Sequence, residues 1–187
     1  FDWHIFRQSV RIGVPSGLQQ TFVSFGMIAL FRIVNNFGTN VIAAYSVAGR
    51  IDSLAMLPAM NFGQALSTFV GQNIGANRTD RVRSGLKATI GMSSVISIIL
   101  TILIILFRRE LMQLFTPDQN VVAVGVGYLI IVSSCYIIFS TMFSLNGLLR
   151  GAGDTLIPMF ITLFSLWIIR IPIAALLSGR VFDTLSN

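Results

Sequence analysis

A few polar side chains inside long apolar segments are the residues through which this chain could do chemistry. Asp52 is the only carboxylate within such a segment. A carboxylate in a membrane either holds a proton or a cation, or is neutralised by a neighbouring base. Arg170 and Arg50 are the candidate bases, although Arg50, two residues away, projects to a different face of a helix. We favour a structural ion pair for Asp52, and a proton or cation site is the alternative.

A stripe of polar residues follows the second apolar segment. Its members recur at spacings of three and four, which places them on one face of a helix. They are Asn61, Gln64, Thr68 and Gln72. Such a face lines a wet cavity or forms hydrogen bonds between helices, and we favour the cavity. Gln20 in the first segment, with Tyr136 and Ser140 in the fourth, are weaker candidates for the same lining, because small hydroxyls more often join packed helices.

No catalytic or metal-binding group is expected from the residue types present. The chain has one His, one Cys and seven scattered acids, which offer no metal cluster, no Cys and His pair and no paired carboxylates at a useful spacing. These counts argue against an enzyme with a resident cofactor. The net charge of +6 does not indicate a nucleic-acid partner, because the Lys and Arg residues stand between apolar runs and not together on one exposed face.

The amino-acid composition indicates that these side chains belong to a membrane protein and not to a soluble domain. Hydrophobic residues make up 54% of the chain and charged residues 11%, with a mean hydropathy of +0.80, whereas a soluble domain carries roughly 25% charged residues. Uncharged runs of 20, 25, 20 and 31 residues occur, and each reaches the ~20 residues that a membrane helix needs. We therefore expect an all-α fold, a polytopic membrane helix bundle of about five transmembrane helices in the lipid bilayer.

The expected bundle is a single transmembrane domain, residues 1–187. Its spans are about 14–37, 41–74, 82–107, 117–149 and 155–178. The second is too long for a ~30 Å hydrocarbon core, and we expect it to be broken near Pro58. The fourth is expected to begin at Pro117 within a capping box, and residues 1–12 are expected to lie at the membrane surface as an amphipathic segment.

The basic residues predict the orientation of the helices. Seven stand in loops on one side of the expected bundle, and three on the other. The seven are Arg7, Arg11, Arg78, Arg81, Arg83, Lys87 and Arg150. The three are Arg108, Arg109 and Arg180. Because cytoplasmic loops carry an excess of Lys and Arg, the first side should be cytoplasmic.

Two motifs in this order resemble the second half of multidrug and toxic compound extrusion (MATE) transporters. The first comprises residues 38–45 (GTNVIAAY), 50–54 (RIDSL) with Pro58, 63–67 (GQALS) and 70–76 (VGQNIGA). The second, residues 146–155 (NGLLRGAGDT) with Pro158, is similar to that family's loop between its tenth and eleventh helices. The resemblance covers nearly the whole chain.

The resemblance implies a transporter of twelve helices in two similar lobes, in which this chain supplies helices seven to eleven, most of one lobe. The first lobe of the same protein is then a missing partner, and the protein is multi-pass in the bacterial inner membrane. Family members are antiporters that export small organic compounds, often cations, by alternating access. A proton or sodium gradient drives them, so the transported ion is the only cofactor implied.

One departure from the family and two alternatives accompany this interpretation. Some members carry an acid in the seventh and tenth helices, whereas residues 14–37 and 121–149 contain none. The coupling carboxylate is therefore expected in the missing lobe, with Asp52 as the only local substitute. The alternatives are a lipid-linked oligosaccharide flippase of the same superfamily, which needs a strongly cationic cavity, and a membrane scaffold without transport, which needs no polar stripe.

Overall fold

The computed structural model describes residues 1–179, so Arg180 lies outside the described part. Every regular element in these residues is a helix. The expected single domain divides into two compact units, one made of Phe1–Phe37 with Gly153–Asn187 and the other of Gly38–Ala152. They are called unit 1 and unit 2 below.

The first helix of unit 1 includes the segment expected at the membrane surface. Helix α1 is continuous over Trp3–Val34, and the short 3-10 helix η1 follows at Asn35–Phe37. Asp2 caps its start, because one carboxylate oxygen accepts the N–H of His4 at 2.8 Å and that of Ile5 at 3.3 Å. Pro15 therefore lies inside the helix rather than in its first turn. A proline there removes one hydrogen bond, which this long helix tolerates.

The second arm of unit 1 is a continuous helix with a widened segment. It consists of α7 at Leu156–Leu163, the π-helical η2 at Phe164–Arg170 and α8 at Ile171–Leu177. Asp154 stabilises its start, since its carboxylate accepts the N–H of Ile157 at 3.2 Å. Pro172 stands in the first turn of α8 and has no N–H to donate to the preceding turn. The π segment lies directly before this interruption, where π-bulges re-satisfy freed backbone groups.

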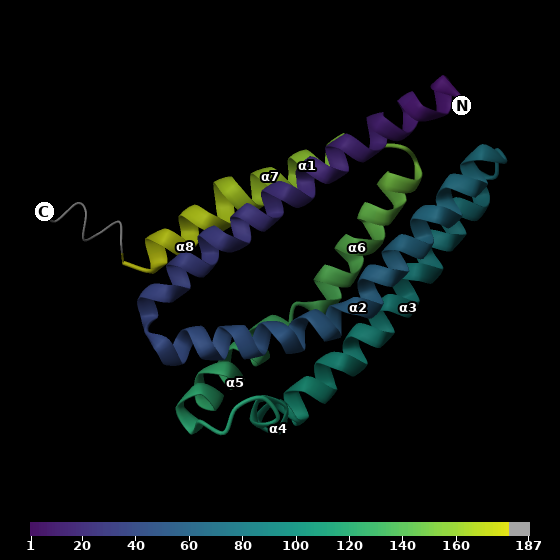
Figure 1. Ribbon diagram of the computed structural model, residues 1–187. Coiled ribbons are helices and arrows are strands. Elements are labelled where there is room, and N and C mark those ends of the chain that lie inside the picture. Colours follow the sequence, from purple (N-terminus) through teal and green to yellow (C-terminus); the bar gives the residue numbers. More distant parts are fainter. Residues whose placement is uncertain (180–187) are drawn as a thin grey trace, which may run out of the picture. The chain divides into compact units, whose positions relative to one another are not determined.

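The two arms of unit 1 run side by side (Figure 1). The buried amide of Gln19 donates to the carbonyl of Pro158 at 3.2 Å and to the hydroxyl of Thr162 at 2.8 Å. Further along, Gly26 packs against Leu166 so closely that a β-carbon on the glycine would overlap that side chain. The arms are therefore joined by polar bonds near one end and by close apolar packing in the middle.

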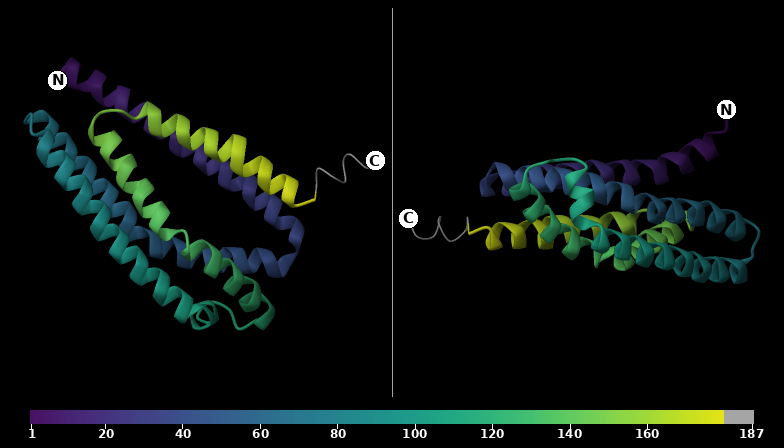
Figure 2. Two further views of the ribbon diagram at one scale, coloured as in Figure 1. Left: turned by 180° about the vertical axis from the view of Figure 1, so that it is seen from behind. Right: turned by 90° about the horizontal axis from the view of Figure 1, so that it is seen from below.

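Unit 2 is built on the longest helix of the chain. Helix α2 spans Thr39–Gly75 and α3 follows at Thr79–Leu106. Pro58 does not end α2, which is continuous in its helical assignment. Instead, the helix changes direction in its middle, as two views show (Figures 1 and 2). The predicted break near Pro58 thus takes the form of a bend within one helix, as expected where a proline removes one internal hydrogen bond.

The predicted span 117–149 is divided into two helices. Helix α5 runs over Gln119–Ser133 and α6 over Tyr136–Gly151, and they are bent by 51° relative to each other. Side-chain hydroxyls compete for carbonyls at the break, because Ser134 donates to Ile130 at 2.7 Å and Thr101 of α3 donates to the carbonyl of Ser133 at 2.8 Å. One of these donors comes from another helix, so the local sequence gives little sign of the break.

The start of α5 also differs from the prediction. The short helix α4 at Arg108–Gln113 precedes it. Asp118 caps α5 by accepting the N–H of Asn120 at 2.8 Å, so the helix begins two residues after Pro117. The hydroxyl of Thr116 accepts the N–H of Asp118 at 3.3 Å. The capping box is replaced by two successive local turns.

Glycines bring α2 and α6 into backbone contact. A β-carbon on Gly63 would lie 2.6 Å from the carbonyl oxygen of Phe143, and one on Gly147 would overlap the carbonyl oxygen of Gly63. Gly151 approaches the backbone of Ser67 in the same way. Small residues at helix crossings allow this approach in membrane proteins. Three successive turns of α6 are therefore fixed against the second half of α2.

Three helical segments are long and apolar enough to cross a membrane: Trp3–Phe37, Thr79–Leu106 and Leu156–Leu177. The bent pair α5 and α6 makes a fourth span if its two halves are counted together. Helix α2, which carries Arg50, Asp52 and the polar stripe, is not among them. The structure thus has the all-α, polytopic character expected, with three or four apolar spans by length and composition where about five were predicted.

Candidate functional site

The carboxylate singled out in the sequence lies at the centre of a small hydrogen-bonded cluster in unit 2. The hydroxyl of Tyr128 donates to one oxygen of Asp52 at 3.1 Å, and the hydroxyl of Tyr136 donates to the other. Asp52, Tyr128 and Tyr136 are called the Asp52 cluster below. Each carboxylate oxygen thus has its own donor, and bonds of this kind to an ionised group are roughly twice as strong as neutral ones.

Three helices position the Asp52 cluster. Asp52 belongs to α2, Tyr128 to α5, and Tyr136 is the first residue of α6. The two tyrosines therefore stand on opposite sides of the break between α5 and α6. Tyr45 of α2 contacts Tyr128 edge-on, with ring centroids 5.6 Å apart and an interplanar angle of 80°. This arrangement orients the Tyr128 ring from the same helix that carries the carboxylate.

The surroundings of the Asp52 cluster are apolar. Tyr136 is only 3% exposed and packs in a hydrophobic cluster that includes Ile51, Ile104 and Leu129. Asp52 itself is half-buried. In such surroundings a charge without hydrogen bonds is costly, so the two hydroxyls account for much of what stabilises the carboxylate.

The ion pair favoured from the sequence is not formed within unit 2. Among the described residues of that unit, no Lys, Arg or His nitrogen lies within 4.0 Å of Asp52, and its bonding partners are the two tyrosine hydroxyls. Arg50 points from a different face of α2, as its spacing requires. Arg170 is an exposed residue of unit 1, so a pairing with Asp52 stays a prediction.

The polar stripe forms an exposed face of α2. All four of its members are exposed. They are Asn61, Gln64, Thr68 and Gln72. The opposite face carries the buried residues that pack in unit 2, among them Ala59, Gly63, Leu66 and Val70. The stripe is thus open on its outer side, and the only side-chain bond within it is a 3.5 Å contact from Thr68 to the carbonyl of Gln64.

The weaker candidates separate into different environments. Gln20 is exposed on α1, while its neighbour Gln19 makes the buried contacts to α7 described above. Ser140 is completely buried, and its hydroxyl donates to the carbonyl of Ile137 at 2.9 Å. Ser140 therefore serves helix packing, and Tyr136 belongs to the Asp52 cluster rather than to an open polar surface.

Sequence reasoning missed Tyr128. Tyr128 and Tyr136 are eight residues apart, a spacing that places two side chains on similar faces of a helix. Two hydroxyls on one face of an otherwise apolar segment were thus a signal for a polar partner on a neighbouring helix. In the described residues, no group of three or more His, Cys, Asp or Glu side chains could hold a metal ion. The Asp52 cluster has the chemistry of a site for a proton or a single small cation.

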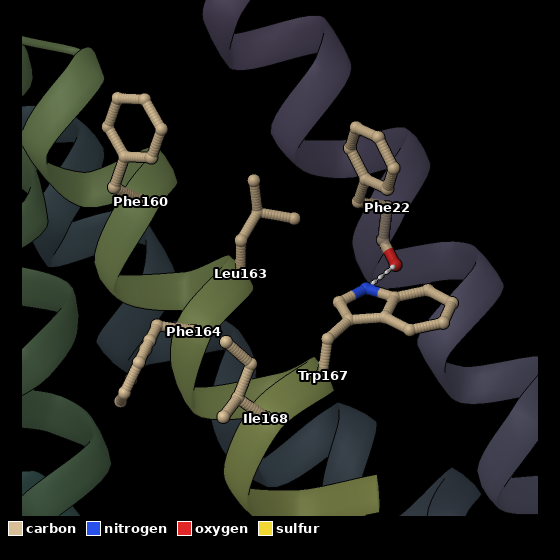
Figure 3. Close-up of a pocket in the computed structure, with 6 residues that line it drawn as sticks. All are labelled: Phe22, Phe160, Leu163, Phe164, Trp167 and Ile168. Atoms are coloured by element: carbon tan, nitrogen blue, oxygen red, sulfur yellow. Dashed lines mark hydrogen bonds between the residues drawn. The ribbon is translucent and has the colours of Figure 1, made fainter.

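Unit 1 has an open apolar groove of about 440 Å³ between its two arms (Figure 3). Its lining residues are Phe22, Phe160, Leu163, Phe164, Trp167 and Ile168. The indole N–H of Trp167 donates to the carbonyl of Phe22 at 3.3 Å. The polar atom of the indole is thus occupied, and the groove presents only hydrocarbon and aromatic surface.

Long apolar helices define a multi-pass helical membrane protein, in which α2 carries a half-buried carboxylate and an exposed amide face. Comparison with known families gives its relationship, since residues 15–176 match the MatE family. The chain belongs to the MatE family, as its two motifs suggested.

Relatives and solved structures agree with this assignment. The chain is 35% identical over 177 residues to the probable multidrug resistance protein YpnP of Bacillus subtilis, a match that covers 95% of this chain and 40% of YpnP. It is 32% identical over 169 residues to the probable multidrug resistance protein YoeA of the same organism, covering 90% of this chain and 36% of YoeA.

A solved structure described as MATE in complex with MaL6 shares the fold, with a TM-score of 0.88 at 19% identity over 96% of this chain and 41% of that one. The chain thus spans about two fifths of the length of the relatives that it matches.

Proposed function

We propose that this chain is part of a secondary active transporter that exports small organic compounds, many of them cations, in exchange for protons or sodium ions. The match to the MatE family over residues 15–176 carries this proposal. Two relatives from Bacillus subtilis bear the name of probable multidrug resistance proteins. The long apolar helices support a protein that works within a membrane, and we infer that this is the bacterial inner membrane.

In the proposed mechanism, this chain contributes one wall of a central cavity. Alternating access requires two lobes that close in turn around a shared site, so the remainder of the transporter supplies the second wall. The polar stripe of α2 supports a role in this wall, because amides with few internal bonds are costly against lipid and favourable against water or a polar substrate. We expect an enzymatic activity neither from this chain nor from the whole transporter.

Efflux of an organic cation from vesicles tests the proposal. The full-length transporter that contains this chain is reconstituted, loaded with ethidium, and given an inward gradient of protons or of sodium ions. With the same ethidium concentration on both sides at the start, the concentration inside should fall below that outside in at least one of these conditions, and this net efflux should stop when the ion gradient is collapsed. Efflux in neither condition, for ethidium and a panel of other organic cations, would refute the proposed function.

A matched pair of variants tests the role of the polar stripe. Gln64 and Ala65 are adjacent and both exposed on α2, but only Gln64 belongs to the stripe. Gln64→Leu should lower the rate of ethidium efflux several-fold, while Ala65→Leu should leave the rate within about twofold of the wild type. Equal effects of the two changes would show that the stripe has no special part in transport.

A further inference from the structure

The Asp52 cluster links α5 and α6, the two helices on either side of the break at residues 134 and 135. Tyr128 comes from the end of α5 and Tyr136 from the start of α6, and their hydroxyls meet on one carboxylate of α2. The two helices are bent by 51° across residues 134 and 135. A change at the carboxylate therefore acts on both sides of the bend at once.

The two halves of this broken span are anchored differently. Helix α6 is fixed to the second half of α2 by the backbone contacts of Gly147 and Gly151. Helix α5 packs against α4, where Met112 lies so close to Gly125 that a β-carbon would overlap its thioether, and also against α2 and α3 through the hydrophobic cluster that contains Val122 and Leu129. Hydroxyl competition for carbonyls already weakens the helical ladder at the junction. A change of angle at Ser134 would leave the glycine contacts of α6 intact and would shift α5 against the apolar surfaces of α2 and α3.

The charge on Asp52 is the feature most easily changed. Within the described part of unit 2, no basic nitrogen lies within 4.0 Å to neutralise it. An ionised carboxylate accepts a bond from each tyrosine, whereas a carboxylic acid has one hydroxyl that donates. Protonation therefore weakens or reverses one of the two bonds, since the charge-assisted bond to the ionised group is the stronger one.

The other titratable and charged groups on the surrounding helices are few. They are Tyr45 and Arg50 on α2, Asp118 at the start of α5, Cys135 before α6, and Arg108, Arg109 and Glu110 on α4. Arg150 stands near the other end of α6, about 21 Å along that helix from Tyr136. On α4, Arg108 donates to the carbonyl of Ile105 and Arg109 to the side chain of Gln119. From α3 the cluster meets apolar Ile104, and the charged residues between positions 80 and 87 of that helix lie about 25 to 36 Å from Ile104 along the helix axis.

We propose that Asp52 is a proton-binding site of this lobe, and that its ionised form fastens the bend between α5 and α6 while protonation releases it. The proposal rests on the proposed antiport, because it assigns the coupling proton a place in this chain. The step is a simple protonation: one proton joins one carboxylate oxygen, and the bond donated by a tyrosine to that oxygen is lost or reversed. No other reactant is required.

The experiment measures the bend directly in the full-length transporter. Nitroxide-bearing unnatural amino acids replace Asn120 on α5 and Leu145 on α6, both of which are exposed. From 1.5 Å per residue and the 51° bend, the two backbone positions are about 34 Å apart in the bent form and about 38 Å apart in a straight one. The distance should lengthen by up to about 4 Å when the buffer changes from alkaline to acidic.

Variants assign this response to Asp52. Asp52→Asn should show the long or broadened distance in both buffers, because an amide carries no charge. Tyr128→Phe and Tyr136→Phe keep the carboxylate but remove one hydrogen-bond donor each. The change of the label distance with pH should therefore be smaller in these variants than in the wild type. They also provide the test if Asp52→Asn fails to fold. Ser53→Ala is the matched control, because Ser53 is exposed and its hydroxyl donates to the carbonyl of Gly49.

Three results would overturn the proposal: a distance that does not change with pH in the wild type, a full pH response in Asp52→Asn, or a change driven by sodium ions at constant pH. The proposed function fails separately, if neither gradient drives ethidium efflux. Gradient-driven efflux together with an unaltered pH response in Asp52→Asn would leave the transport proposal standing and refute the role of Asp52.

Discussion

Replacement of Gly147 by alanine tests whether backbone contact holds α6 against α2. The added methyl group would overlap the carbonyl oxygen of Gly63 and lie against the backbone around it. Backbone atoms cannot rotate away as a side chain can, so the helices must separate. Overpacking of this kind costs about 1–3 kcal/mol, and the upper half of that range applies here.

A gain in helix propensity offsets part of this cost. Alanine is about 1 kcal/mol more favourable than glycine within a helix. The net expectation for Gly147→Ala is therefore a loss of about 1–2 kcal/mol in the free energy of unfolding. Gly91→Ala is the matched control, because Gly91 lies within α3 and a β-carbon there meets nothing within 4 Å. It should be neutral or stabilising by up to about 1 kcal/mol.

The assay is the unfolding of the full-length transporter in detergent micelles, followed by circular dichroism as a denaturing detergent is added. Gly147→Ala should shift the transition to lower denaturant and Gly91→Ala should not. If the two variants have the same free energy of unfolding, the close approach of α2 and α6 does not stabilise the protein, and the reasoning from the glycine contacts is wrong.

Three further predictions follow from the described contacts. Gln19→Leu should destabilise the transporter by about 1 kcal/mol through loss of two hydrogen bonds within the membrane, while Gln20→Leu, on an exposed position, should change the unfolding free energy little. Asp154→Ala should cost about 1 kcal/mol because it removes the cap of α7, whereas Asp80→Ala, which removes no cap, should cost less; the same denaturation assay checks both pairs. Finally, the 187-residue chain alone should not accumulate substrate in vesicles under an imposed gradient, because alternating access needs two lobes.

The sequence was sufficient to predict the apolar helices and one residue of the Asp52 cluster, Asp52 itself. Uncharged runs identified the apolar helices, because hydrocarbon excludes charge strongly enough to leave a pattern in composition alone. Asp52 was found for a related reason, as the only carboxylate within the expected spans. A local feature such as the bond from the N–H of Ile157 to Asp154 is of the kind that a sequence can indicate, since a cap depends only on residues close in the chain.

The features that could not be predicted depend on other helices. The break between α5 and α6 involves a hydroxyl of Thr101, 32 residues away from the carbonyl that it binds. The partners of Asp52 are 76 and 84 residues away, and nothing in the composition ranks a tyrosine above an arginine as its neighbour. The first span was expected to begin near residue 14, yet Asp2 caps α1 twelve residues earlier, so that Pro15 lies inside the helix.

The π segment of unit 1 bears on how this chain is compared with its relatives. A π turn closes its hydrogen bonds one residue later than an α turn, so residues 164–170 accommodate one more residue than the same length of regular helix. Side chains from Ile171 onward are rotated by one position around the axis relative to an uninterrupted helix. A relative that is α-helical throughout this span would align correctly only with a one-residue gap between Phe164 and Arg170, and without that gap each residue of α8 would be equated with a neighbour that faces a different direction.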